Sequence, residues 1–129
     1  MKATGTFTVN FDPKDCSLDS SDHADFARMA IKKTFSGDLV ASSQGEMLSI
    51  RTGESNSAAY VALEHVEALL EGKKGSFVLQ HYGSMNRGAD FLLLEVVPDS
   101  ASAELQGLSG KMTIEIKEGT HHYHFSYNL

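Results

Sequence analysis

Cysteine is almost absent from this sequence, and long apolar runs are missing. With Cys16 as its one cysteine the chain cannot form an internal disulfide, which is typical of a protein from a reducing compartment. No apolar run approaches the ~20 residues that a membrane-spanning helix needs. The first residues, MKATGTFTVNF, alternate polar with apolar side chains and do not resemble a signal peptide. We therefore expect a cytoplasmic protein whose mature chain begins where the sequence does.

Basic residues are also scarce. The chain has 11 Lys and Arg against 17 Asp and Glu, which leaves a net charge of −6. A negative protein is repelled by nucleic acid and by an anionic membrane surface. We expect neither as a partner.

The motifs of several common mechanisms are missing as well. The sequence has no P-loop and no G-x-G-x-x-G, which argues against nucleotide hydrolysis and hydride transfer. The GLSG at 107–110 lacks the second spacer of a G-x-S-x-G elbow. Cys16 lies among Asp12, Asp15 and Asp19, whose negative charges disfavour a reactive thiolate. We expect no cofactor.

What the sequence has in abundance is short stretches in which polar and apolar residues alternate, as at 6–11, 112–117 and 123–129. Such alternation is typical of antiparallel strands. Phe91–Val97 is nearly all apolar, so we expect that strand to be covered on both faces. Asp12–Asp25 is expected to be a loop. The length and the lack of a linker predict a single domain, residues 1–129.

The stretch at 59–70 fits two interpretations. Ala59, Leu63, Val66 and Leu70 recur at helical spacing, and Gly72 could end such a helix. The local pattern alone leaves helix and strand open, and Ser21–Ile31 shows a weaker form of the same ambiguity.

Four stretches resemble a known bacterial family: KTFSGDL at 33–39, the stretch at 60–83 with its GKKGSFVLQH core, VVPDSASAELQGLSG at 96–110, and the closing HHYHFSYNL. In this order they resemble the family known as domain of unknown function 3224, which has no established activity. The resemblance implies an all-β fold, a closed antiparallel barrel of about eight strands similar to that of plant allene oxide cyclase, with 60–71 as a strand. The family usually has Thr-Gly where this chain reads Ser102-Ala103, and the difference concerns the local turn.

In such a barrel, alternation sorts the side chains between the interior and the outer surface. Tyr60 and Glu64 share one face of their strand. Inside a barrel a carboxylate is costly unless hydrogen-bonded, and its pKa would rise, which suits a general base. We therefore predict Glu64, with Tyr60, as candidate catalytic residues, the alternative being a solvated glutamate on the outer face.

A barrel of about eight strands can hold one small ligand or be filled by its own side chains. Phe77, Leu79 and His81 share one strand face, opposite Gln80. These three residues, together with the pair near the C-terminus, form our candidate ligand-binding set: Phe77, Leu79, His81, Tyr123 and Tyr127. Tyr123 and Tyr127 also suit a purely structural role in the core.

The histidines near the C-terminus raise the question of a metal site. His122 and His124 would lie on one strand face and could both reach a divalent ion. The H-x-H spacing is similar to that of cupins, but no glutamate follows at the required distance before Leu129. We expect no metal, and a surface role for His121, His122 and His124.

Three functions remain, from different classes. The first is a module that binds a small, largely apolar molecule in the barrel. The second is a cofactor-free isomerase or cyclase, suggested by the resemblance to allene oxide cyclase, so whether the protein is an enzyme stays open. The third is a homo-oligomeric interaction protein with a filled barrel, whose outer strand faces would present Leu92, Leu94 and Val96.

Overall fold

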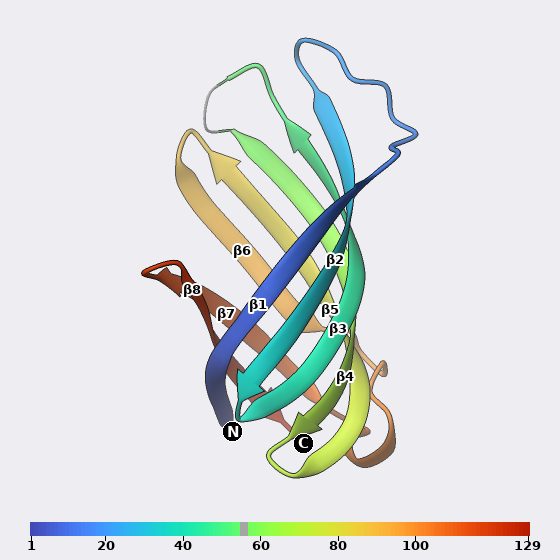
Figure 1. The fold of residues 1–129 in the computed structure, drawn as a ribbon, viewed down its shortest axis with the longest axis vertical. Helices are drawn as coiled ribbons and strands as arrows, with labels where there is room; N and C mark the ends of the chain where they lie inside the picture. The colour runs from blue at the N-terminus through green and yellow to red at the C-terminus, as the bar shows by residue number, and fades with distance from the viewer. Residues whose placement is uncertain (55–56) are drawn as a thin grey trace.

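The alternating stretches form strands that wrap around a common axis (Figure 1). This computed structural model describes residues 1–54 and 57–129. The elements of the described residues, in chain order, are β1 (Lys2–Lys14), β2 (Asp25–Gly37), β3 (Leu39–Arg51), β4 (Ala58–Leu70), β5 (Lys73–Asn86), β6 (Ala89–Val96), the 3-10 turn η1 (Ala103–Leu105), β7 (Ser109–Lys117) and β8 (Thr120–Asn128).

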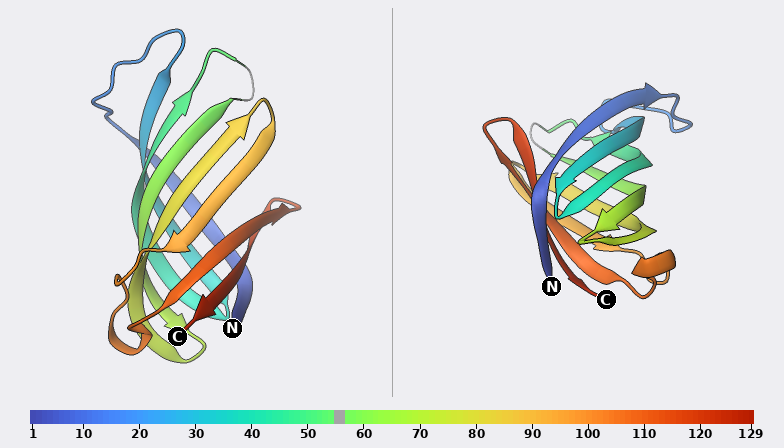
Figure 2. Two further views of the ribbon diagram at one scale, coloured as in Figure 1. Left: turned by 180° about the vertical axis from the view of Figure 1, so that it is seen from behind. Right: turned by 60° about the horizontal axis from the view of Figure 1, so that its bottom comes forward.

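The strands are joined in sequence order, and β8 pairs with β1 to close the barrel. Every neighbouring pair is antiparallel (Figures 1 and 2). The predicted closed barrel of about eight antiparallel strands is therefore confirmed. The expected loop at Asp12–Asp25 is shorter than predicted, because β1 runs on to Lys14 and β2 begins at Asp25. No helix long and apolar enough to span a membrane occurs in the described residues.

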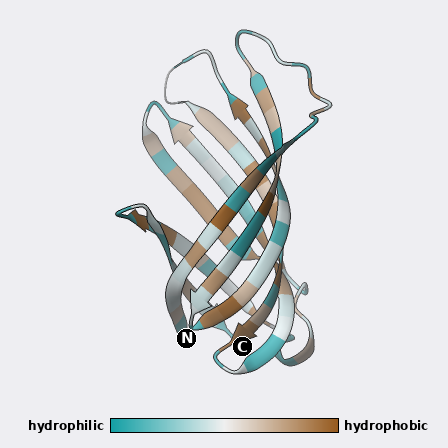
Figure 3. Ribbon diagram, in the orientation of Figure 1, coloured by the Kyte–Doolittle hydropathy of each residue, from teal (hydrophilic) through white to brown (hydrophobic). Residues whose placement is uncertain are grey.

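β4 settles the ambiguity between helix and strand. Alternate residues, including Ala62, Glu64 and Val66, are buried, while Leu63 between them is exposed. Figure 3 shows hydrophobic and hydrophilic residues interspersed along the strands. The helical interpretation is wrong because β3 and β5 pair with β4 along its whole length, and this pairing outweighs a short local pattern.

β6 contradicts two expectations. Leu94 and Val96 are buried on the inward face, and Leu92 shares that face by alternation, so these residues do not form an outer oligomerisation surface. Phe91 faces outward and is exposed, so the strand is not covered on both faces. A continuous apolar run therefore marks two faces with different surroundings, one packed on the core and one in contact with solvent.

The end of the barrel that holds the β2–β3, β4–β5 and β6–β7 connections is filled; we call it the closed end, and it is the lower end in Figure 1. The Tyr123 hydroxyl accepts a hydrogen bond from the Leu39 backbone N–H at 2.9 Å and lies 2.9 Å from the Ser36 carbonyl oxygen. Leu105 of η1 and Leu108 are also buried there. Aromatic rings pack above them, with Phe77 and Phe125 stacked at 6.0 Å between centroids.

The opposite end, which we call the open end, is built differently. β7 and β8 have nine residues each, against 13 or 14 in β1–β5. Among the described residues β6 and β7 share a single register pair, Glu95 with Lys111. The longer strands thus extend beyond the β7–β8 hairpin (Figure 1). Four inward-facing apolar residues at this end stay partly exposed: Phe11 of β1 at 56%, Met85 of β5 at 37%, Leu92 of β6 at 36% and Ile116 of β7 at 64%.

Candidate functional site

A buried network of charged and polar side chains lies midway along the barrel. Glu64 on β4 is fully buried and binds three partners from neighbouring strands. Its Oε1 lies 3.0 Å from Lys33 Nζ of β2 and 2.8 Å from His81 Nε2 of β5, and its Oε2 accepts a hydrogen bond from Ser43 Oγ of β3 at 2.5 Å. Four consecutive strands, β2–β5, therefore contribute one side chain each.

Strand register explains why these residues meet. Lys33 and Ser43 are direct cross-strand partners, and Gly45, two residues further along β3, is opposite Glu64. A β-carbon on Gly45 would lie 2.3 Å from the Leu63 carbonyl oxygen, so β3 and β4 approach here too closely for any side chain. The Lys33 ammonium also lies 4.8 Å from the centroid of the Phe7 ring, a cation–π contact.

The pKa of Glu64 is shifted in the opposite direction to the one predicted from the sequence. Burial by itself raises this pKa, but the hydrogen bond from His81, the charge of Lys33 and the hydrogen bond from Ser43 lower it, to about 2. The expected rise in pKa is therefore wrong, because the sequence did not reveal the partners that favour the charged form. An ionised carboxylate whose oxygens are all engaged is a poor general base, and it can instead orient His81.

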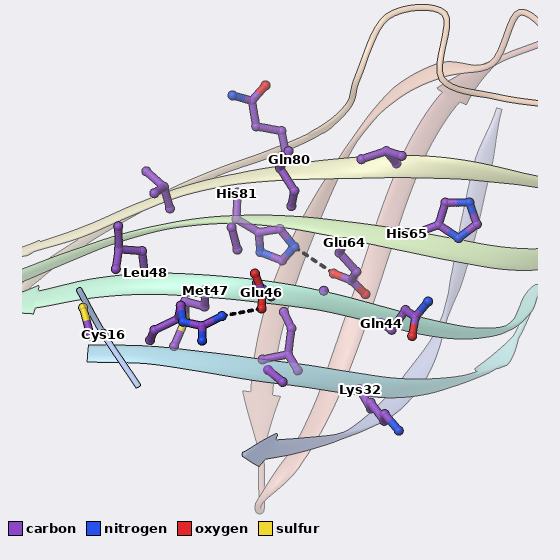
Figure 4. A pocket seen from close by; sticks show the side chains of 18 of the residues that line it. Cys16, Lys32, Gln44, Glu46, Met47, Leu48, Glu64, His65, Gln80 and His81 are labelled. Carbon is purple, nitrogen blue, oxygen red and sulfur yellow. Dashed lines mark hydrogen bonds and ion pairs between the residues drawn. The ribbon is translucent and has the colours of Figure 1, made fainter. Parts of the chain in front are cut away.

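His81 is the member of the network that remains available to other molecules. Its Nε2 is engaged by Glu64 (Figure 4). Within residues 1–54 and 57–129, no side-chain nitrogen or oxygen that is cut off from solvent lacks a hydrogen-bond partner, and Nδ1 of His81 has no protein partner. Nδ1 therefore keeps contact with solvent, although the residue as a whole is buried.

Tyr60 lies next to His81 on the side of the open end. The centroids of the two rings are 6.4 Å apart. The Tyr60 ring covers Gly83, where an added β-carbon would lie 2.2 Å from a ring carbon. Burial raises the pKa of the Tyr60 hydroxyl. Register places Leu94 opposite His81 and Leu92 opposite Gly83, so these inward residues form one continuous surface.

The other predicted ligand contacts lie elsewhere. Phe77, Leu79, Tyr123 and Tyr127 face inward but are buried in the hydrophobic core, and the Tyr127 hydroxyl donates a hydrogen bond to Glu71 at 2.9 Å. Core packing accounts for these four residues without a ligand. Their role as ligand contacts stays a prediction.

Sequence reasoning did not single out two members of the network, Lys33 and Ser43. A signal was present for Lys33, which stands in phase with Ile31 and Phe35 in an alternating strand, where an apolar residue is expected. Ser43 carried a weaker signal, because serine is common on either face of a strand.

A groove of about 1270 Å³ runs along the outer face of the same four strands (Figure 4). Its lining comes from β2–β5 and from Asp15–Leu18. An interior cavity would also be lined by β6, β7 or β8, and none of the described lining residues belongs to these strands. The outward side chains of Val61 and Leu63 lie in it and are exposed. Glu64 and His81 of the network also belong to its lining, so the groove and the network share residues as well as strands.

The C-terminal histidines divide between the two faces of β8, with His122 and His124 on the outer face by alternation. His121 packs inward against Phe7, with 5.0 Å between ring centroids, whereas His124 is exposed and 3.9 Å from a carboxylate oxygen of Glu115. In the part of the chain that the structure describes, no three His, Cys, Asp or Glu side chains are grouped to hold a metal ion.

Comparison with known proteins settles the family. The family described as "Protein of unknown function (DUF3224)" matches residues 3–127. The chain belongs to this family. A crystal structure of a DUF3224 protein with unknown function from Shewanella oneidensis MR-1 is similar to it, with 48% sequence identity, a TM-score of 0.97, and coverage of 100% of this chain and 96% of that one. No curated protein matches. The similarity to allene oxide cyclase stays a prediction.

Proposed function

We propose that this protein binds a small, largely apolar molecule in the open half of the barrel, the inward surface between the Glu64 network and the open end. One observation carries the proposal: inward-facing apolar residues, among them Leu92 and Phe11, are left exposed. Exposed apolar surface costs roughly 25 cal/mol per Å² relative to buried surface. A bound apolar molecule would cover it.

The polar groups beside this surface support the same proposal. Ligand sites combine apolar walls with a few placed polar groups, and His81 and Tyr60 supply them here. Replacing a buried ion pair by apolar residues is often neutral or stabilising. Stability alone is therefore a weak reason for the presence of Lys33 and Glu64 in the interior. Charged groups in the interior of a barrel are a signature of a functional site.

The test uses Nile red, a neutral apolar dye whose fluorescence rises in apolar surroundings. Leu92→Ser should weaken dye binding several-fold, because Leu92 faces the proposed site. Leu93→Ser is the matched control, since the next residue of β6 faces outward. The proposal would be refuted if both variants lost dye binding to the same extent, or if the wild type did not bind the dye.

A cofactor-free isomerase or cyclase is a second candidate, favoured by the contact between His81 and Glu64. A carboxylate that holds one imidazole nitrogen leaves the other free to take a proton from a substrate. In D₂O such an enzyme would incorporate deuterium next to the carbonyl of a bound ketone such as 2-decanone, and His81→Phe would stop this. A wild type that exchanges no faster than buffer argues for binding alone.

We also propose a cytoplasmic, homo-oligomeric protein without nucleic-acid or membrane partners. The single cysteine and the net charge of −6 support the location and the excluded partners. Self-association is supported by exposed outward residues on β4 and β5, Val61, Leu63 and Tyr82, in place of the inward Leu92, Leu94 and Val96. Leu63→Lys should convert an oligomer to monomer in sedimentation velocity, and a monomeric wild type would refute self-association.

A further inference from the structure

The hydrogen-bonding pattern of Glu64 fixes what His81 can offer to a ligand. An ionised carboxylate only accepts hydrogen bonds. Lys33, Ser43 and His81 must therefore all act as donors to Glu64, at 3.0, 2.5 and 2.8 Å. The hydrogen of His81 consequently sits on Nε2, the atom nearest Glu64.

The buried network already contains one cation and one anion. Lys33 already neutralises Glu64, and both side chains are buried. A second positive charge on the buried His81 ring would have no carboxylate of its own, and its desolvation would cost free energy. A neutral ring whose hydrogen lies on Nε2 presents a lone pair at Nδ1, which is a hydrogen-bond acceptor.

This acceptor is directed into the open half of the barrel. Nδ1 keeps solvent contact, His81 faces inward, and the closed end is packed with core residues. Tyr60, whose ring lies 6.4 Å from that of His81, places a hydroxyl on the same surface. One hydroxyl group on a ligand could donate to Nδ1 and accept from Tyr60.

We propose that the open half selects apolar molecules bearing a neutral hydrogen-bond donor, a hydroxyl group above all, and rejects carboxylates of the same size. The inference rests on the proposed binding function and adds a chemical class of ligand. A carboxylate would set its oxygens against the lone pair of Nδ1. It would also bring a second negative charge toward Glu64, in a protein of net charge −6.

The test compares three ten-carbon probes at pH 7.5 by displacement of Nile red: 1-decanol, its methyl ether and decanoate. The alcohol should bind at least about tenfold more tightly than decanoate, and several-fold more tightly than the ether, which lacks the donor. Decanoate binding as tightly as the alcohol would overturn the inference, and so would an ether equal to the alcohol. In either case, binding of the dye itself would still support the proposed binding function.

Variants locate the selectivity. His81→Phe removes the acceptor and should abolish the preference for the alcohol over its ether, whereas Gln80→Ala, on the outward face of β5, should keep it. A preference that survives in folded His81→Phe overturns the assignment to His81. If that variant does not fold, the three probes on the wild type decide by themselves. A wild type that binds neither the dye nor any probe refutes the proposed function and this inference together.

Discussion

Glu64 carries its charge inside the barrel because its partners outweigh the cost of burial. Its ordinary pKa is 4.5. Burial raises this pKa, but the opposite effect of His81, Lys33 and Ser43 is larger and brings the pKa down to about 2. A pKa depressed in the folded state stabilises the fold above the ordinary value, and this stabilisation is lost as pH falls from 4.5 toward 2. Its size is on the order of 3 kcal/mol.

Glu64→Gln should therefore be less sensitive to acid than the wild type. We expect urea unfolding at pH 7 to show a less stable variant, and the gap to narrow steadily between pH 5 and pH 2, because only the wild type loses the charged network there. The other carboxyl groups titrate in both proteins and cancel in the difference. A gap that stays constant over this range would contradict the assignment.

Lys33 tests the same network from its cationic side. Lys33→Met leaves Glu64 buried without a cation and should lower the free energy of unfolding by about 3–5 kcal/mol. Adding Glu64→Gln to this variant should restore part of the loss, because the uncompensated charge is gone. Urea midpoints of the single and double variants give the coupling, and strictly additive losses would show that the two side chains act independently.

At the scale of elements, period-two alternation predicted β1, β7 and β8, whereas β4 was predicted as a strand from the family resemblance. What alternation could not predict was the environment of each face. It did not show that the face of β6 with Phe91 is exposed, or that Lys33 reaches Glu64, because both depend on register and on which strand comes next. Glu64 was predicted from the sequence, whereas the direction of its pKa shift follows from partners that only the structure shows.

The turn at η1 offers a separate test of backbone strain. Ala103 has φ of 54°, in the left-handed region that favours glycine, and glycine is the residue that the family resemblance leads us to expect there. Ala103→Gly should raise the free energy of unfolding by about 1 kcal/mol. Ala101→Gly is the control in the same connection: Ala101 packs against the core and lacks a positive φ, so this change should be destabilising. Thermal unfolding distinguishes the two signs, and a destabilised Ala103→Gly would contradict the interpretation.

At the scale of the whole molecule, the barrel has a filled half and an open half, with the Glu64 network between them. The closed end is filled by Tyr123, Leu105 and Leu108, which are buried, and the Tyr123 hydroxyl is hydrogen-bonded to the Leu39 backbone. The open end follows from the short β7–β8 hairpin and the single β6–β7 register pair found among the described residues. The outer groove is an alternative place for an apolar molecule, on the opposite face of the same strands.

Methyl NMR on a dye-bound sample separates these two surfaces most directly. On titration with Nile red we predict that the methyl signals of Leu92 and Met85, on inward faces, shift in proportion to occupancy, while those of Val61 and Leu63 in the outer groove stay in place. Shifts confined to Val61 and Leu63 would contradict the account, because the ligand would then lie outside the barrel.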